Sequence, residues 1–166
     1  MTAVTATTQD APLTYDFGRG PIPARQLPGG AWAALSASIG AGASIGAWAS
    51  IGEGASIGAG ASIGARASIG ERAIIGEWAS IRTTRDAMVV GPVGSRRAYL
   101  SAYRMPDNSV RFSTGCFSGT LAELLAACDV THGPAHEHTL DYRALATLAH
   151  ATLTARLAGA GEGTTP

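Results

Sequence analysis

The histidines are the residues best suited to hold a metal ion. All four follow position 131, and three stand in T-H-G-P-A-H-E-H as His132, His136 and His138. Three imidazoles with a glutamate among them are the residue types of a transition-metal site. The Gly-Pro pair after His132 breaks the helical register that would align these side chains, and a polar loop between two helices explains the same residues. We favour the loop and therefore expect neither a metal site nor a cofactor.

Cys116 is the candidate nucleophile. It stands in S-T-G-C-F-S-G-T, just before a predicted helix start, and an approaching histidine would activate its thiol. A strand-end cysteine more commonly packs as a small hydrophobic side chain. The other cysteine, Cys128, forms no C-x-x-C pair with it, so a disulfide framework is excluded and a reducing cytosol is expected.

The segment G-P-V-G-S-R-R, residues 91 to 97, has groups that can bind an anion. Its glycines expose backbone amides, and its hydroxyl and two guanidiniums suit a phosphate or a carboxylate. The chain contains no lysine, so the segment is not a phosphate-binding P-loop, and a tight turn with solvated arginines is the alternative. Two arginines on neighbouring predicted strands would extend the positive patch. The candidate ligand-binding residues are Gly94, Ser95, Arg96, Arg97, Arg104 and Arg111.

The element that must support these residues is a repeat with a period of six. From Ala37 to Ile81 the chain reads ASIGAG ASIGAW ASIGEG ASIGAG ASIGAR ASIGER AIIGEW ASI. Within A-S-I the side chains alternate inward and outward, as in a short strand. The Gly-x-x that follows turns the chain, since glycine adopts backbone conformations barred to other residues. This period does not fit a helix.

The repeat resembles the hexapeptide-repeat family, whose consensus has an aliphatic residue, a glycine or small polar residue, two variable residues, a small residue and another variable one. The resemblance implies a left-handed parallel β-helix in which three hexapeptides form one triangular coil, and a homotrimer assembled through the β-helix faces. A further coil begins near Trp32 if Ala31-Trp32-Ala33 is part of the stack. Residues three repeats apart would then stack: Trp48 over Arg66 in a cation–π contact, Gly60 over Trp78, and Glu53 over Glu71.

The same resemblance implies acyltransferases with a catalytic histidine and carbonic anhydrases with three zinc-binding histidines. The repeats here contain no histidine and no inserted loop of the kind that shapes an acyl-CoA site. The β-helix therefore lacks the residue on which both reactions depend. An acyltransferase would need a group from the C-terminal part, with His132, His138 or Cys116 as candidates.

The predicted fold is mainly β, a left-handed parallel β-helix followed by a small α+β module. Three segments between residues 87 and 117 have the pattern of an antiparallel meander. The capping box T-L-A-E opens a helix from about 120 to 127, and a second helix runs from 139 to about 157. The predicted boundaries are 1–12 for a disordered N-terminus, 13–36 for a cap, 37–84 for the β-helix, 85–158 for the module and 159–166 for a disordered tail. The cap contains Tyr15, Phe17, Ile22 and Leu27.

The composition limits the classes of partner that we expect for this protein. The formal net charge is zero, so nucleic acid is not an expected partner. We find neither an apolar run long enough to cross a membrane nor a signal sequence, so we expect a cytoplasmic protein without a membrane partner.

The order of aromatic Pro-rich opening, repeats, G-P-V-G-S-R and T-G-C-F-S-G-T resembles bacterial and phage proteins without an assigned activity. We therefore predict a non-catalytic trimeric scaffold or binding protein, whose module binds an anionic ligand or a protein partner. The alternative is an acyltransferase with a histidine from the module.

Overall fold

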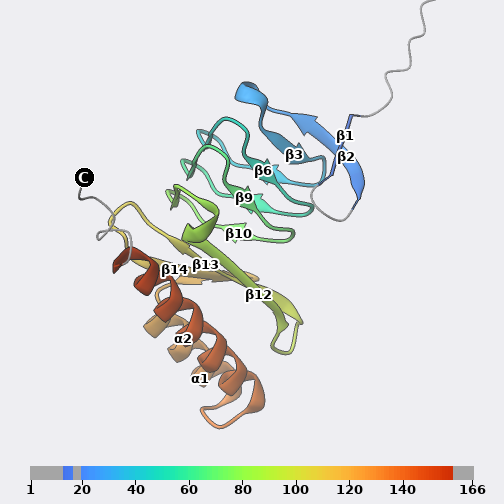
Figure 1. Cartoon of the computed structure of the whole chain (residues 1–166). Helices are drawn as coiled ribbons and strands as arrows, with labels where there is room; N and C mark the ends of the chain where they lie inside the picture. The colour runs from blue at the N-terminus through green and yellow to red at the C-terminus, as the bar shows by residue number, and fades with distance from the viewer. Residues whose placement is uncertain (1–12, 17–19, 159–166) are drawn as a thin grey trace, which may run out of the picture.

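The computed structural model describes residues 13–16 and 20–158. The predictions for residues 1–12, for Phe17 and for residues 159–166 lie outside this range. The chain is mainly β, with two helices. Figure 1 shows three layers, in which a stack of short-stranded coils meets an antiparallel sheet and two helices cover the far face of that sheet.

The coils repeat every 18 residues, as predicted. Ile57 pairs in parallel register with Ile39 on one side and Ile75 on the other. The isoleucines from Ile51 onward, except Ile74, are at most 3% exposed and fill the interior. Three parallel sheets result, β3-β6-β9, β4-β7-β10 and β5-β8-β11. The strands are β3 (Trp32–Ala34), β4 (Ser38–Ile39), β5 (Ser44–Ile45), β6 (Ser50–Ile51), β7 (Ser56–Ile57), β8 (Ser62–Ile63), β9 (Ser68–Ile69), β10 (Ile74–Ile75) and β11 (Ser80–Ile81).

The glycine that follows each A-S-I is needed to leave space for the next coil, and not for its backbone conformation as predicted. A Cβ on Gly40 would lie 2.5 Å from the backbone nitrogen of Ala59, and one on Gly58 would lie 2.5 Å from that of Glu77. The next coil thus leaves no room for a side chain. The left-handed φ values of 56° to 71° occur two residues later in each repeat, so the expectation that this glycine supplies the unusual φ is wrong. Those positions are Gly42, Trp48, Gly54, Gly60, Arg66, Arg72 and Trp78.

The side-chain stacks agree with the prediction in part. The Trp78 ring lies on Gly60, whose Cβ would be 2.5 Å from two indole carbons, so this pair stacks as expected. The Trp48 ring instead lies against Gly30, which comes shortly before β3 and the first coil. Among the described residues the cation–π contact is made by Arg72, whose guanidinium lies 5.7 Å from the Tyr99 ring centroid, and not by Arg66.

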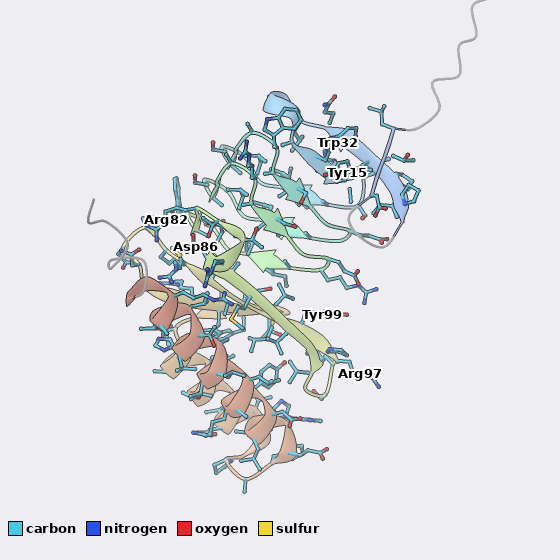
Figure 2. The ribbon with its side chains drawn as sticks, in the orientation of Figure 1. Tyr15, Trp32, Arg82, Asp86, Arg97 and Tyr99 are labelled. Atoms are coloured by element: carbon cyan, nitrogen blue, oxygen red, sulfur yellow. The ribbon has the colours of Figure 1, made fainter. Side chains whose placement is uncertain are left out.

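The first coil begins at β3, which pairs in parallel with β6. Before it, β1 (Thr14–Asp16) and β2 (Pro21–Gln26) form a hairpin that continues the same sheet, followed by the 3-10 helix η1 (Pro28–Gly30). Tyr15 stacks on Trp32 with ring centroids 5.0 Å apart (Figure 2). This segment therefore extends the N-terminal end of the stack.

A four-stranded sheet covers the other end. Its strands are β12 (Ala87–Val93), β13 (Ala98–Arg104), β14 (Val110–Thr114) and β15 (Phe117–Gly119), in that order. The predicted meander had three strands, and the structure has four. The last predicted segment folds back at Gly115, where φ is 54°, and its second half forms β15. On β13, Ser101 and Tyr103 face the coils, and the Ser101 Oγ accepts a hydrogen bond of 2.8 Å from the Ile74 amide.

The helices α1 (Leu121–His132) and α2 (Glu137–Ala158) pack on the opposite face of this sheet. The predicted capping box is present, and α1 extends further than predicted, to His132. The Thr120 backbone amide and hydroxyl both donate to the Glu123 carboxylate, which lowers the pKa of Glu123. Among the described residues, neither helix combines the length and the apolar character needed to cross a membrane.

Candidate functional site

The turn between β14 and β15 is the centre of the candidate site. It carries Gly115 and Cys116, and both residues line two neighbouring pockets. The first, which we call the arginine pocket, has a volume of about 310 Å³. Its polar lining comes from Ser95, Arg96, Thr114, Cys116, Thr131, His132 and Tyr142.

The β12–β13 turn positions Arg96 in this pocket. The turn closes through a hydrogen bond of 3.0 Å from the Arg97 amide to the Gly94 carbonyl oxygen. Gly94 has a φ of 71°, and a Cβ there would lie 2.6 Å from the Tyr142 ring, so glycine is required both for the backbone and for the packing. Arg97 does not line the pocket, and Figure 2 shows it at the tip of the turn, pointing away from the body of the molecule.

The pocket wall opposite the turn contributes hydroxyl groups. Tyr142, on α2, lies with its Oη 3.5 Å from the Thr114 Oγ1. No ion pair or hydrogen bond occupies the Arg96 guanidinium among the residues that the structure describes. A cation that can form two parallel hydrogen bonds, with hydroxyls around it, suits a carboxylate or a phosphate.

Cys116 and His132 both line the arginine pocket. The Cys116 thiol is exposed, and His132 is the last residue of α1. Cys128 is buried, and desolvation first, then the charge of Asp129, raises the pKa of its thiol. Of the two cysteines, Cys116 is thus the one that a ligand in this pocket can reach.

The three histidines considered as alternative metal ligands lie together in space. The ring centroid of His132 is 5.6 Å from that of His136 and 5.5 Å from that of His138. The Nδ1 of His136 accepts a hydrogen bond of 3.2 Å from the His138 amide. Within residues 13–16 and 20–158, no group of three or more His, Cys, Asp or Glu side chains is arranged to hold a metal ion.

Arg104 and Arg111 lie outside the arginine pocket. Arg104 is 1% exposed, and its Nε lies 2.8 Å from an Asp86 carboxylate oxygen. Its Nη2 donates to the Leu153 carbonyl oxygen on α2. Arg111 is exposed on β14 and lines the second pocket, on the coil side of the sheet. The four arginines of the predicted patch therefore lie in four different environments.

The second pocket, which we call the coil cleft, lies between the last complete coil and β14–β15. It measures about 560 Å³, and its polar and aromatic lining includes Glu77, Trp78, Tyr103, Arg111, Ser113 and Ser118. This cleft was not predicted from the sequence. The pattern that could have indicated it is the occurrence of Ser101, Tyr103 and Ser113 on one face of two neighbouring strands. A sheet face covered by another layer would ordinarily carry apolar residues at such positions.

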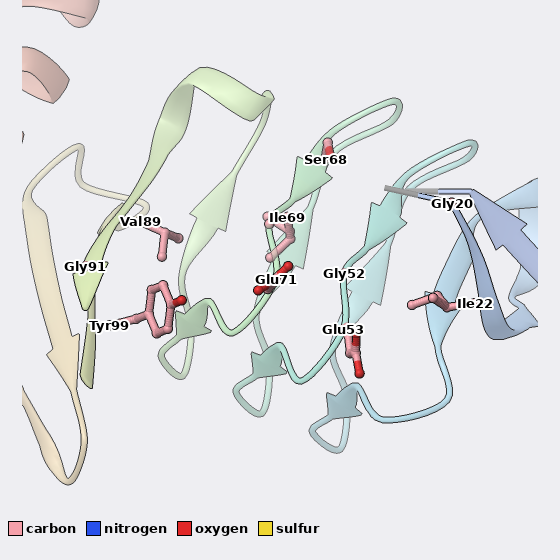
Figure 3. Close-up of a pocket in the computed structure, with 11 residues that line it drawn as sticks. Gly20, Ile22, Gly52, Glu53, Ser68, Ile69, Glu71, Val89, Gly91 and Tyr99 are labelled. Atoms are coloured by element: carbon pink, nitrogen blue, oxygen red, sulfur yellow. The ribbon is translucent and has the colours of Figure 1, made fainter. Parts of the chain in front are cut away.

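A third concavity, of about 430 Å³, lies beside the β6–β9 sheet. Figure 3 shows Glu71 between Glu53 and Tyr99, with Ile22 and Val89 at opposite ends. Glu53 and Glu71 occupy equivalent places in successive coils, as predicted, and the Arg72 amide donates to the Glu53 carbonyl oxygen at 2.8 Å. We call this concavity the acidic groove.

Comparison with known proteins gives one result. Residues 49–83 match the family model for the bacterial transferase hexapeptide (six repeats). No curated protein and no solved structure matched the chain. The similarity thus covers the coils from residue 49 onward and the coil side of the coil cleft. The four-stranded sheet, the helices and the arginine pocket lie outside it.

Proposed function

We propose that this chain is a non-catalytic binding protein that forms a homotrimer and binds a small carboxylate or phosphate in the arginine pocket. In this proposal the chain consists of a cap at 13–36, a left-handed β-helix at 37–84 and an α+β module at 85–158. The β-helix serves as a scaffold that presents three copies of the module, which would multiply the avidity for a multivalent partner.

The observation that carries this proposal is the position of Arg96. Its guanidinium lines a concave pocket together with four hydroxyl-bearing residues and without an acidic side chain in the lining. Because Arg96 lines the pocket and no Asp or Glu does, the charge of the pocket wall is positive. A small anion can bind there through charge-assisted hydrogen bonds, each worth about 1.5 to 3 kcal/mol.

Two adjacent arginines provide a matched test. We expect Arg96→Gln to weaken the binding of inorganic phosphate or citrate by about 10- to 100-fold, because it removes the charge in the pocket. Arg97→Gln removes the same charge from the tip of the same turn and should leave the affinity within about twofold. Isothermal titration calorimetry measures both. Equal losses in the two variants, or no binding of either anion to the unmodified protein, would contradict the proposal.

Acyl transfer is the second candidate, because the matched family model describes transferases and because His132 lines a pocket with Cys116. In this reaction His132 would take the proton of an acceptor hydroxyl or amine as that group attacks an acyl thioester and releases the thiol. The described lining of the coil cleft contains no histidine, and that of the arginine pocket contains no coil residue. Neither pocket therefore combines a histidine with a β-helix face.

The two candidates differ in turnover. An acyltransferase should consume acetyl-coenzyme A in the presence of a panel of amines and sugars, and His132→Gln should abolish this while His150→Gln does not. A binding protein shows no consumption with any variant. Loss of the thioester absorbance distinguishes the two results.

A further inference from the structure

The aromatic side chain at the mouth of the coil cleft is unusually exposed. Trp78 has 65% of its surface exposed, although indoles are mostly buried in soluble proteins. It is also held in a left-handed conformation, with φ at 58°, which costs of order 1 kcal/mol for a residue with a Cβ. One side of the ring lies on Gly60, where the absence of a side chain lets the indole approach the coil. The indole is thus a supported platform beside a cleft.

The floor of the cleft is a cluster of hydroxyls. The Oη of Tyr103 lies 2.8 Å from the Oγ of Ser113, and the Oγ of Ser118 lies 3.4 Å from both. Three hydroxyls carry three donors and six lone pairs, so a closed cluster uses all its donors and leaves three acceptor positions. Tyr103 and Ser113 are at most 2% exposed, whereas Ser118 is exposed, so a ligand meets this cluster at the Ser118 hydroxyl, which can rotate to donate or to accept. Such a floor suits a ligand that itself carries hydroxyl groups.

The charges in the cleft cancel. Glu77 comes from the coil side and Arg111 from β14, and both line the cleft. Although both side chains are described, no ion pair joins them. One acceptor of hydrogen bonds and one donor, with opposite charges, give no preference for an anion or for a cation. This distinguishes the coil cleft from the positively charged arginine pocket.

We infer that the coil cleft is a second binding site, which takes a neutral polyhydroxylated ring such as a pyranose. The apolar face of the ring stacks on Trp78, and its hydroxyls reach Ser118, the exposed member of the hydroxyl cluster. Glu77 and Arg111 accept and donate hydrogen bonds at the sides. The cleft volume of about 560 Å³ lies within the range of small-molecule sites.

The chain contains a matched control for the platform. Trp48 occupies the same last position of its repeat, has a left-handed φ of 61°, lies on a glycine and is 68% exposed, but it does not line the coil cleft. We expect a titration with free monosaccharides, glucose, galactose and N-acetylglucosamine, to shift the indole NMR resonance of Trp78 and not that of Trp48. Trp78→Ala should then weaken the affinity of the bound sugar by at least about tenfold, and Trp48→Ala should leave it within twofold.

Ser118→Ala tests the floor and should weaken the affinity for the same sugar. An NMR spectrum that is unchanged elsewhere shows that the sheet is intact. Failure of all three sugars to shift the Trp78 resonance overturns the inference, as does an equal loss in the two tryptophan variants. A shift caused by adenosine and by none of the sugars also overturns it, because the site would then select a flat base. Arg96→Gln should leave sugar binding unchanged and Trp78→Ala should leave phosphate binding unchanged, so the two sites can fail separately.

Discussion

A single glycine position determines how closely the coils can approach. In the early repeats the backbone of the next coil occupies the space that a Cβ would need, as at Gly40, where Ala59 lies 2.5 Å away. At Gly70 no heavy atom lies within 4 Å of the same Cβ position, because the chain leaves the stack for β12 before a further coil covers this place. Two glycines with the same repeat position therefore face opposite packing constraints.

This contrast gives a residue-scale prediction. We expect Gly40→Ala to lower the free energy of unfolding by about 2 kcal/mol, because the added methyl group must push two coils apart. Gly70→Ala places a methyl group in open space at a φ that is not left-handed, and it should be neutral or stabilise by up to about 1 kcal/mol. Urea denaturation measures both. A similar loss in both variants would mean that the glycines act through backbone conformation rather than through coil spacing.

At the scale of elements, the structure depends on the junction where the coils end. The 3-10 helix η2 (Thr84–Asp86) follows the last coil strand, and Asp86 is 8% exposed. Its carboxylate accepts hydrogen bonds from the amides of Arg82 and Thr83, at 3.0 and 2.9 Å, and it faces the buried Arg104 on β13. Because Arg104 also binds the α2 backbone, this pair connects the coil stack, the sheet and the helix layer.

Removal of Asp86 should therefore be costly. Asp86→Ala leaves Arg104 buried without a counter-charge, and its Nη1 has no hydrogen-bond partner within the described part of the chain. We expect a loss of about 3 to 5 kcal/mol in the free energy of unfolding. Arg82→Ala is the control, because it keeps the backbone amide and removes only an exposed side chain whose Nε lies 3.8 Å from the same carboxylate (Figure 2). It should cost less than about 1 kcal/mol. A loss below 1 kcal/mol for Asp86→Ala would show that the junction does not depend on this charge.

At the scale of the whole molecule, the sequence predicted the coils and not their contact with the sheet. The six-residue period predicts the register of the coil strands, because each Ile pairs with the Ile three repeats away. The packing of Tyr103 on Gly76 and the bond from Ile74 to Ser101 join segments about 27 residues apart without a shared pattern. Both pockets depend on such contacts, so local sequence reasoning found several of their residues without finding the pockets.

The three faces of the coil stack differ in the concavities beside them and in the size of their outward side chains. The acidic groove lies beside β6–β9, and the coil cleft opens beside β7–β10. Neither concavity includes a residue of the β5-β8-β11 sheet. Its outward side chains are Ser44, Ser62 and Ser80, which are small and allow close approach of another chain. This face is therefore our choice for the trimer contact.

An arginine in the middle of that face tests the choice. Native mass spectrometry of the unmodified protein should give three times the mass of one chain. Ser62→Arg should shift the assembly to monomers, because a long charged side chain in the centre of a close contact must be desolvated without a partner. Ser62→Thr adds one methyl group and should keep most of the trimer. A monomeric unmodified protein would contradict the trimer itself, whereas a trimer that tolerates Ser62→Arg would place the contact on another face.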